Sequence, residues 1–251
     1  MKHPSLYHRI LKVAIWVLFL VFITNLNAQA SYKITYHISE TIPNTPREEM
    51  EPRIRQLSEQ INAYAENVHY ILVANNEYSY FELEESLGKA RSSHHDNMLY
   101  TMAKLAPSFN KEVYVDYIED SIVFIRNLAA SDYTVKRDFY DFDWEIKEDT
   151  KQILGLEARK AKGNYIHPST HEEMKVEAWF VPSISLQSGP DIFMGLPGLI
   201  AEVHLKQAVV TAIKIESNSK TEIKKINDAK AMSQKELEEL IIDLTGKFID
   251  N

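Results

Sequence analysis

Histidine is the residue type whose spacing in this sequence suggests chemistry most directly. His167 and His171 are four residues apart, and His94 and His95 are adjacent. Imidazole nitrogens bind borderline metals such as copper and zinc, so these four residues are candidate ligands of a metal site. The competing interpretation is that both groups lie in exposed polar loops, because Pro168 favours a turn over a helix between the first two.

Enzyme motifs in the sequence are incomplete. Residues 171–175 read His-Glu-Glu-Met-Lys, which begins like the HExxH zinc helix but lacks its second histidine. The sequence contains no Gly-x-Ser-x-Gly elbow and no glycine-rich phosphate loop. With no cysteine, it offers no thiol nucleophile, thiolate cluster or disulfide. We therefore expect a binding protein without a cofactor rather than an enzyme. A hydrolase whose site is assembled from distant residues is the alternative.

Three of the seven glycines lie within ten residues, at positions 189, 195 and 198. Residues 196–199 (Leu-Pro-Gly-Leu) fit a type II turn, because proline sets φ at about −65° in the second position and glycine accepts a positive φ in the third. Gly195 offers a further unusual dihedral, or a close approach of another backbone or a ligand. The segment is apolar, so we expect it to fold inward, either as a structural corner of a sheet or as a binding loop. As a binding loop it would contribute Gly189, Pro190, Phe193, Gly195, Leu196, Pro197, Gly198, Leu199 and Ile200.

The elements that must position these residues are mainly strands. Residues 31–40 alternate apolar and polar side chains with a strict period of two, which is typical of a strand with one wet face. About ten short strands are predicted through residue 226, including a hairpin at Asn75-Asn76, one strand at residues 151–162 and one at residues 220–226. The tight connections leave no room for the helical crossovers that parallel strands need. We therefore predict an α+β, mainly β domain built on one curved antiparallel meander, an open sheet or half-barrel.

Two helices are predicted beside the sheet. Pro52 suits the first turn of a helix, and apolar residues recur at helical spacing through residue 65. Ser233 and Glu236 form a capping box ahead of an apolar stripe that ends near residue 248. This last helix should pack its apolar side on the sheet or cap one of its ends. Residues 85–110 show no clear periodicity and are interpreted as a long loop.

The first thirty residues have the pattern of a secretory signal peptide. Three cations and no acid accompany an apolar run at residues 13–23, and the small residues Ala28 and Ala30 follow. The run is about half the roughly 20 residues of a membrane-spanning helix. An uncleaved membrane anchor is the alternative. We predict cleavage after Ala28 or Ala30, which leaves a single domain at residues 31–251 without a membrane span, in the periplasm or at the outer membrane.

Charge argues against a nucleic-acid partner. Without residues 1–30, which hold three cations and no acid, the chain has 25 basic against 36 acidic residues, a net charge of −11. A nucleic-acid backbone is bound by clustered Lys and Arg. The one basic stretch, residues 214–230, is interleaved with acids, which is typical of a solvated surface.

Several of the 13 tyrosines fall on predicted strands. A curved sheet lined by tyrosine and aliphatic side chains would present an amphipathic concave surface able to hold an apolar ligand or a peptide. The alternative is that these aromatic side chains simply fill the core, because strands favour them for packing.

The sequence Gly-Leu-Pro-Gly-Leu-Ile at residues 195–200 matches the signature of the GLPGLI family, which this chain resembles. Trp144 with the following Glu-Ile, residues 153–155 (Ile-Leu-Gly) and residues 178–180 (Ala-Trp-Phe) stand in the order expected of that family. The resemblance implies a secreted envelope protein of Gram-negative bacteria, often encoded beside TonB-dependent outer-membrane receptors and of uncharacterised function. It brings no catalytic residues. Many relatives carry a cysteine where residues 157–159 read Glu-Ala-Arg, so a thiol-dependent role is not implied here.

The leading hypothesis is a non-enzymatic periplasmic or outer-membrane-associated protein. It would bind an apolar or peptide ligand, or an envelope protein such as a TonB-dependent receptor, through its curved sheet and the loop at residues 189–200. The alternative is an envelope metal-handling protein that binds copper or zinc through the four histidines. A hollow inner face of the sheet would favour the first hypothesis, and titration with the two metals tests the second.

Overall fold

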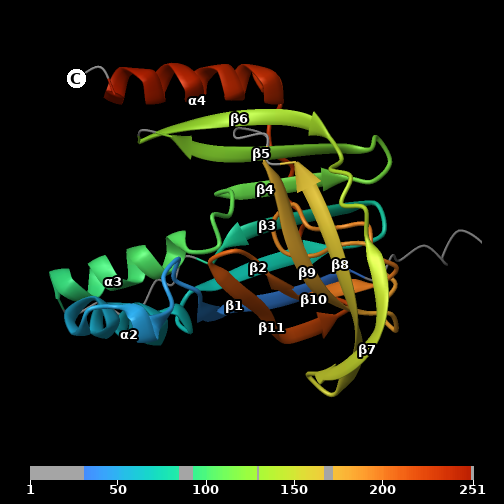
Figure 1. Cartoon of the computed structure of the whole chain (residues 1–251). Coiled ribbons are helices and arrows are strands. Elements are labelled where there is room, and N and C mark those ends of the chain that lie inside the picture. The colour runs from blue at the N-terminus through green and yellow to red at the C-terminus, as the bar shows by residue number, and fades with distance from the viewer. Residues whose placement is uncertain (1–30, 85–92, 129, 167–171, 250–251) are drawn as a thin grey trace, which may run out of the picture. The chain divides into compact units, whose positions relative to one another are not determined.

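The computed structural model describes residues 31–84, 93–128, 130–166 and 172–249. The strands are β1 (Tyr32–Thr41), β2 (His69–Ala74), β3 (Tyr78–Leu83), β4 (Glu112–Asp116), β5 (Ser121–Leu128), β6 (Ser131–Asp138), β7 (Glu145–Ile153), β8 (Leu156–Ile166), β9 (Glu173–Val181), β10 (Leu199–His204), β11 (Ala208–Ser217) and β12 (Met232–Ser233). They form one sheet in the order β12-β6-β5-β4-β3-β2-β1-β11-β10-β9-β8-β7 (Figure 1). Only the β12–β6 pair is parallel among these strands. The predicted mainly β, mostly antiparallel sheet is confirmed, and it does not close into a barrel.

β1 lies in the middle of the sheet and supplies part of its core. Its alternation places Ile34, Tyr36 and Ile38 on the inner face, each with 0% of its surface exposed. Burying side chains of this size stabilises the fold by roughly 1.5–3 kcal/mol each. The Tyr36 hydroxyl also donates a hydrogen bond of 2.8 Å to the carbonyl oxygen of Ile200, which ties β1 to β10.

The hairpin predicted at Asn75-Asn76 is confirmed between β2 and β3. Asn75 Oδ1 accepts hydrogen bonds from the backbone N–H groups of Glu77 and Tyr78, at 2.9 and 2.7 Å. The single strand predicted at residues 151–162 is wrong, because a second hairpin divides it into β7 and β8. Leu154 and Gly155 have φ of +50° and +75°, the pair of positive values that a tight two-residue hairpin requires.

The described residues form three α-helices, α2 (Pro52–Ala65), α3 (His94–Leu105) and α4 (Gln234–Ile249), and one 3₁₀ turn, η1 (Arg47–Glu49). The two predicted helices correspond to α2 and α4. The capping box at the start of α4 is present: Glu236 N donates to Ser233 Oγ at 3.3 Å, and Ser233 N donates to a Glu236 carboxylate oxygen at 2.6 Å. None of the described helices is long and apolar enough to cross a membrane.

α3 corrects the prediction that residues 85–110 are an irregular loop. Ser93 Oγ accepts a hydrogen bond of 3.1 Å from Asp96 N and so caps the helix. Leu99, Tyr100 and Ala103 are buried on one side of it, and the helix packs beside α2. Its stability therefore comes mainly from packing against α2 and the sheet, because His, Asp and Asn at its start are weak helix formers.

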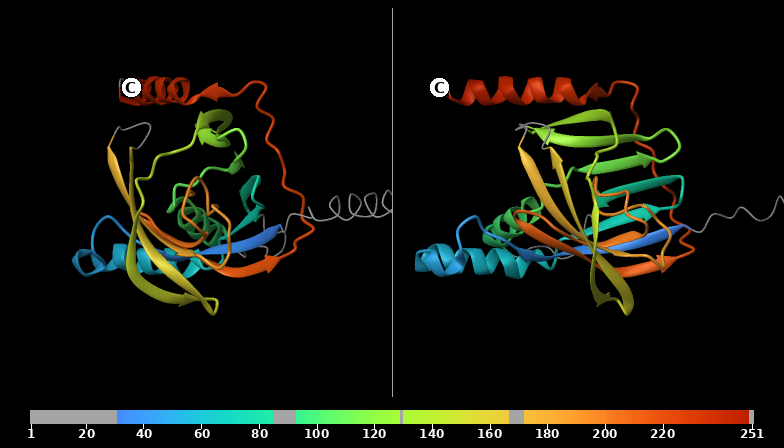
Figure 2. Two further views of the ribbon diagram at one scale, coloured as in Figure 1. Left: turned by 90° about the vertical axis from the view of Figure 1, so that its right-hand side faces the viewer. Right: turned by 45° about the vertical axis from the view of Figure 1, so that its right-hand side comes forward.

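The strand predicted at residues 220–226 is also wrong. Residues 218–231 form an irregular segment that runs along the outside of the sheet to reach β12 (Figure 2). Ile226 is buried there against Tyr80 and Tyr114. Lys224 Nζ pairs with the Glu82 carboxylate at 2.8 Å. Side-chain contacts across the sheet, rather than backbone pairing, hold this segment in place.

Two segments run inside the curve of the sheet (Figure 2). The first, the aromatic segment (residues 139–144), connects β6 to β7, and the second, the inner loop (residues 182–198), connects β9 to β10. Phe142, Phe193 and Leu196 from these segments belong to the main hydrophobic core. The inner face of the sheet is therefore largely filled by the chain itself.

Candidate functional site

The inner loop departs from the predicted type II turn. In that turn Leu199 N would donate to Leu196 O, but it donates instead to Ile184 O at 3.1 Å. Gly198 N donates to Leu196 O at 2.8 Å, which closes a three-residue γ-turn centred on Pro197. The type II prediction is wrong because an earlier residue of the same loop supplies the acceptor for Leu199.

Close backbone contacts explain two of the three clustered glycines. A Cβ atom on Gly198 would lie 2.4 Å from the carbonyl oxygen of Val181, and the φ of Gly198 is +155°. A Cβ atom on Gly189 would lie 2.7 Å from the carbonyl oxygen of Phe193. Gly195 has open surroundings but a φ of +89°, which side chains disfavour. The first two positions need glycine for space, and the third needs it for backbone conformation.

Most of the predicted binding residues are packed into the core. Of the nine, only Gly195 and Pro197 are exposed. Backbone hydrogen bonds join the first half of the loop to the second, such as the bond of 3.0 Å from Gly195 N to Gln187 O. This is the arrangement of a structural corner for most of the segment. Gly195 and Phe193 differ from the rest because each also lines a cavity.

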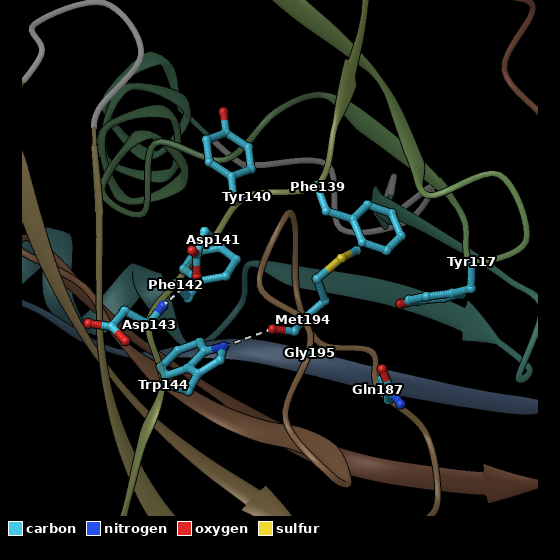
Figure 3. Close-up of a pocket in the computed structure, with 10 residues that line it drawn as sticks. All are labelled: Tyr117, Phe139, Tyr140, Asp141, Phe142, Asp143, Trp144, Gln187, Met194 and Gly195. Carbon is cyan, nitrogen blue, oxygen red and sulfur yellow. Dashed lines mark hydrogen bonds between the residues drawn. The ribbon is translucent and has the colours of Figure 1, made fainter.

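A cavity of about 310 Å³ lies between the aromatic segment and the inner loop (Figure 3). We call it the aromatic cavity. Its volume is at the lower end of the range typical of small-molecule sites, about 300–1,000 Å³. It is lined by Tyr117, Phe139, Tyr140, Asp141, Phe142, Asp143, Trp144, Gln187, Met194 and Gly195.

Trp144 determines the shape of one wall of this cavity. Its Nε1 donates a hydrogen bond of 2.8 Å to the carbonyl oxygen of Met194, drawn as a dashed line in Figure 3. The indole also stacks on Phe142, with ring centroids 5.2 Å apart. On β8, a Cβ atom at Gly163 would lie 2.7 Å from the indole ring. Glycine at position 163 therefore leaves the space that the Trp144 side chain occupies.

The polar groups of the cavity are hydroxyls, the side-chain amide of Gln187 and exposed carboxylates. Tyr117 shares a hydrogen bond of 2.8 Å with Ser188 Oγ, and burial raises the pKa of the Tyr117 hydroxyl. Burial also raises the pKa of Tyr140, an effect that Arg137, 3.3 Å from the ring centroid, partly opposes. Both phenols are therefore neutral hydrogen-bonding groups at physiological pH. Asp141 is exposed at the edge of the cavity.

The aromatic segment carries a signal for this cavity in the sequence itself. Residues 139–144 read Phe-Tyr-Asp-Phe-Asp-Trp, four aromatic residues interrupted by two aspartates. Of these six residues, the family resemblance involves only Trp144. Such density of aromatic residues between two strands indicates a connection that is buried rather than a solvated loop.

The predicted histidine ligands are not brought together by the described part of the chain. His94 and His95 begin α3 and are exposed. Consecutive residues on a helix do not face each other, so these two imidazoles diverge. Residues 31–84, 93–128, 130–166 and 172–249 contain no group of three His, Cys, Asp or Glu side chains able to hold a metal ion. His167 and His171 lie outside the described residues.

A charged cluster without a signal in the local sequence lies on the face of the sheet opposite the core. Glu202 is only 7% exposed and accepts hydrogen bonds from Lys151 Nζ at 2.5 Å, from Thr211 Oγ1 at 3.1 Å and from His204. Burial opposes ionisation of Glu202, but the hydrogen bonds and charges of His204 and Lys151 outweigh it and lower the pKa to about 2. Lys151 Nζ also lies 4.4 Å from the ring centroid of Trp179. This is an ion-pair network held by three adjacent strands and β7.

Comparison with known proteins adds one finding. The profile of a family described as a protein of unknown function (Porph_ging) matches residues 159–202. The matched part contains most of β8, all of β9, the whole inner loop and the start of β10. A search of curated proteins found no match. Over the residues that include the Gly-Leu-Pro-Gly-Leu-Ile sequence, the chain is thus similar to an uncharacterised family.

Proposed function

We propose that the protein is an exported binding protein of the cell envelope, without catalytic activity, that holds a small ligand with an aromatic or apolar body. The ligand occupies the aromatic cavity. Five of its ten lining residues are aromatic, and the side-chain amide of Gln187 offers hydrogen bonds that orient a ligand. The polar groups around the cavity are neutral phenols, the Gln187 amide and exposed carboxylates, which supports a binding role in this proposal.

The observation that carries the proposal is the way the cavity is kept open inside a packed core. The Trp144 indole is held by its hydrogen bond to the Met194 carbonyl oxygen, and its ring fits into the space that Gly163 leaves free. The inner loop forms the opposite wall, and the backbone hydrogen bond from Gly195 N to Gln187 O joins its two halves. Walls that are held before a ligand arrives lower the ordering cost of binding.

Nuclear magnetic resonance of the mature protein tests the proposal. The chain after residue 30 contains two tryptophans, Trp144 at the cavity and Trp179 outside it, and each gives one indole N–H signal. Titration with naphthol, a neutral aromatic probe, should shift the Trp144 signal in a saturable way and leave that of Trp179 unchanged. The Trp179 signal is thus an internal control for non-specific effects of the probe.

A variant at the edge of the cavity provides the matched control. Gln187 is exposed and lines the cavity, so Gln187→Phe should narrow it, whereas Gln187→Asn should leave its volume nearly unchanged. We expect naphthol affinity to fall at least about tenfold in the first variant only. The proposal fails if naphthol moves both indole signals alike, moves neither, or binds Gln187→Phe as well as the native protein.

Export and envelope location are part of the same proposal and rest on residues 1–30, with the partner suggested by the family resemblance. Cell fractionation with mass spectrometry of the N-terminus should find the protein in the envelope fraction, starting at residue 29 or 31. Affinity isolation from envelope extracts tests a TonB-dependent receptor as partner. An uncleaved, cytoplasmic chain would contradict the export proposal without affecting the cavity experiment.

A further inference from the structure

A second cavity, of about 400 Å³, shares Tyr140 with the aromatic cavity. Residues from α4, β5, the ends of β8 and β9 and the β10–β11 turn line it. We call it the basic cavity because of its charged residues, Arg126, Lys175 and Lys206 against the single acid Asp191. Three cations around one cavity are unusual here, because residues 31–251 carry a net charge of −11.

The two lysines of the basic cavity are unpaired in the described part of the chain. Neither Lys175 nor Lys206 makes an ion pair or a side-chain hydrogen bond with a described residue, and both are exposed at the edge of the cavity. Arg126 is held in place by its Nη1, which donates to the carbonyl oxygen of Ser108 at 2.9 Å. The guanidinium group is thereby oriented while its positive charge stays uncompensated by an ion pair.

Asp191 interacts electrostatically with Arg126 but offsets only part of the positive charge of the three cations. Its Oδ1 already accepts two hydrogen bonds from Asn110, from the backbone N at 3.0 Å and from Nδ2 at 2.9 Å. The carboxyl group is buried, and burial raises its pKa in spite of these hydrogen bonds. The cavity therefore keeps an excess of positive charge.

The remainder of the wall mixes apolar and uncharged polar side chains, and one buried polar atom in it has no hydrogen-bond partner among the described residues. Phe124, Ile192, Leu237 and Ile241 line the cavity from three different elements. Gln234 at the start of α4 also lines it, and its Oε1 is buried without a hydrogen-bond partner among the described residues. A buried acceptor without a partner is rare in native proteins and costs stability unless a bound group supplies a donor, and of the two head groups considered below only a singly protonated phosphate carries one.

We propose that the basic cavity binds an amphiphile that consists of an apolar chain and an anionic head, a carboxylate or a phosphate. The chain lies against Phe124, Leu237 and Ile241, and the head binds Arg126 with Lys175 and Lys206. Guanidinium groups bind carboxylate and phosphate oxygens through paired, charge-assisted hydrogen bonds, which makes Arg126 the main determinant of head-group recognition. This site is distinct from the aromatic cavity, and binding here does not require a ligand in the aromatic cavity.

Three probes with the same ten-carbon chain test the proposal by isothermal titration calorimetry of the mature protein. Decanoate and decyl phosphate carry anionic heads, and decanol carries a neutral one. We expect at least one anionic probe to bind about tenfold or more tightly than decanol, because hydrogen bonds to charged groups are stronger than neutral ones. The stronger of the two anions identifies the head group as carboxylate or phosphate. Equal affinity for all three probes overturns the proposal.

Charge-removing variants locate the binding site. Arg126→Gln and the double variant Lys175→Gln/Lys206→Gln should each weaken binding of the preferred anion about tenfold or more and leave decanol binding unchanged. The matched control is Lys235→Gln. Lys235 lies on α4, one of the elements around the cavity, but its own side chain is 83% exposed and does not line the cavity. The double variant keeps the test valid if Arg126→Gln perturbs folding, since neither lysine has a structural partner among the described residues. Unchanged affinity in the double variant, or an equal loss in Lys235→Gln, contradicts the proposal.

The two indole signals separate this inference from the proposed function. The preferred anion should leave the Trp144 and Trp179 indole signals in place and shift the side-chain amide signal of Gln234. Charge-dependent binding of this anion without any effect of naphthol on Trp144 would reject the aromatic site and keep the basic one. If naphthol shifts the Trp144 signal but decanol and both anions bind with equal affinity, the basic site is rejected and the aromatic one is kept.

Discussion

Trp144 and Met194, fifty positions apart in the sequence, are joined by a hydrogen bond of 2.8 Å from the indole Nε1 to the backbone carbonyl oxygen. Met194 directly precedes Gly195, whose φ of +89° turns the inner loop. The bond therefore fixes the loop backbone immediately before its left-handed residue. One side chain on the aromatic segment thus links that segment to the inner loop beside the aromatic cavity.

Trp144→Phe should loosen the inner loop while keeping an aromatic ring on the wall. The substitution leaves the buried Met194 carbonyl without its donor, which should lower the free energy of unfolding by about 1–2 kcal/mol. The amide of Gly195, bonded to Gln187 O, should exchange its hydrogen faster. Urea unfolding and hydrogen exchange measure the two effects.

Trp179→Phe is the control for that experiment. Trp179 Nε1 has no hydrogen-bond partner among the described residues, so the same substitution there removes no hydrogen bond. Exchange at Gly195 should stay at the native rate in this variant. Equal acceleration in both variants would show that the Trp144–Met194 bond does not hold the loop.

Gly198→Ala should destabilise the protein strongly. The new Cβ atom would lie 2.4 Å from the carbonyl oxygen of Val181, a backbone atom that cannot move alone. We expect a loss of about 3 kcal/mol or more in unfolding free energy. Gly155→Ala is the comparison: its φ of +75° is also positive, but no atom lies within 4 Å, so it should cost only roughly 1–2 kcal/mol. Similar thermal unfolding of both variants would count against the close-contact argument.

Glu202 should make the protein sensitive to acid. The pKa of Glu202 in the folded protein is about 2, below its ordinary value. Its contribution to the free energy of unfolding is therefore fully present above about pH 4.5 and disappears as the pH falls toward 2. The loss should be on the order of 1–3 kcal/mol. Glu202→Gln should be less stable than the native protein at pH 7 and show a flatter decline below pH 4.5 in urea unfolding. The control is Glu148→Gln on the exposed part of β7, and an acid profile of Glu202→Gln as steep as that of this control would contradict the assignment.

Asp191→Asn should raise the stability of the free protein at neutral pH. Burial raises the pKa of this carboxyl group, so keeping it ionised above that pKa costs free energy. Asparagine keeps the Oδ1 acceptor for Asn110 and tolerates the φ of +55°. We expect a gain of about 1 kcal/mol at pH 7 that shrinks in acid, measured by thermal unfolding. Asp191→Leu loses the acceptor and should destabilise instead; equal losses in both variants would refute the explanation.

Local sequence patterns predicted the elements that carry their own signal. The strict alternation of β1, the Asn75 hairpin and the Ser233–Glu236 capping box are each complete within a few residues, and all three are present. α3 was missed because its cap at Ser93 is followed by weak helix formers and its apolar face is stabilised by α2, a distant segment. The segment that contains Ile226 was read as a strand because local apolar spacing does not tell backbone pairing from side-chain packing across a sheet.

By itself the sequence determined that the inner loop must turn inward and that glycine is needed there, because proline, glycine and apolar residues restrict the backbone locally. Only the tertiary structure decided which turn forms, since the acceptor for Leu199 N is Ile184 O rather than Leu196 O. It also decided that an aromatic cavity exists at all. Trp144, Gly163 and Met194 come from three separate segments, and the curvature of a twelve-stranded sheet, set by long-range pairing rather than by neighbouring residues, brings them into contact.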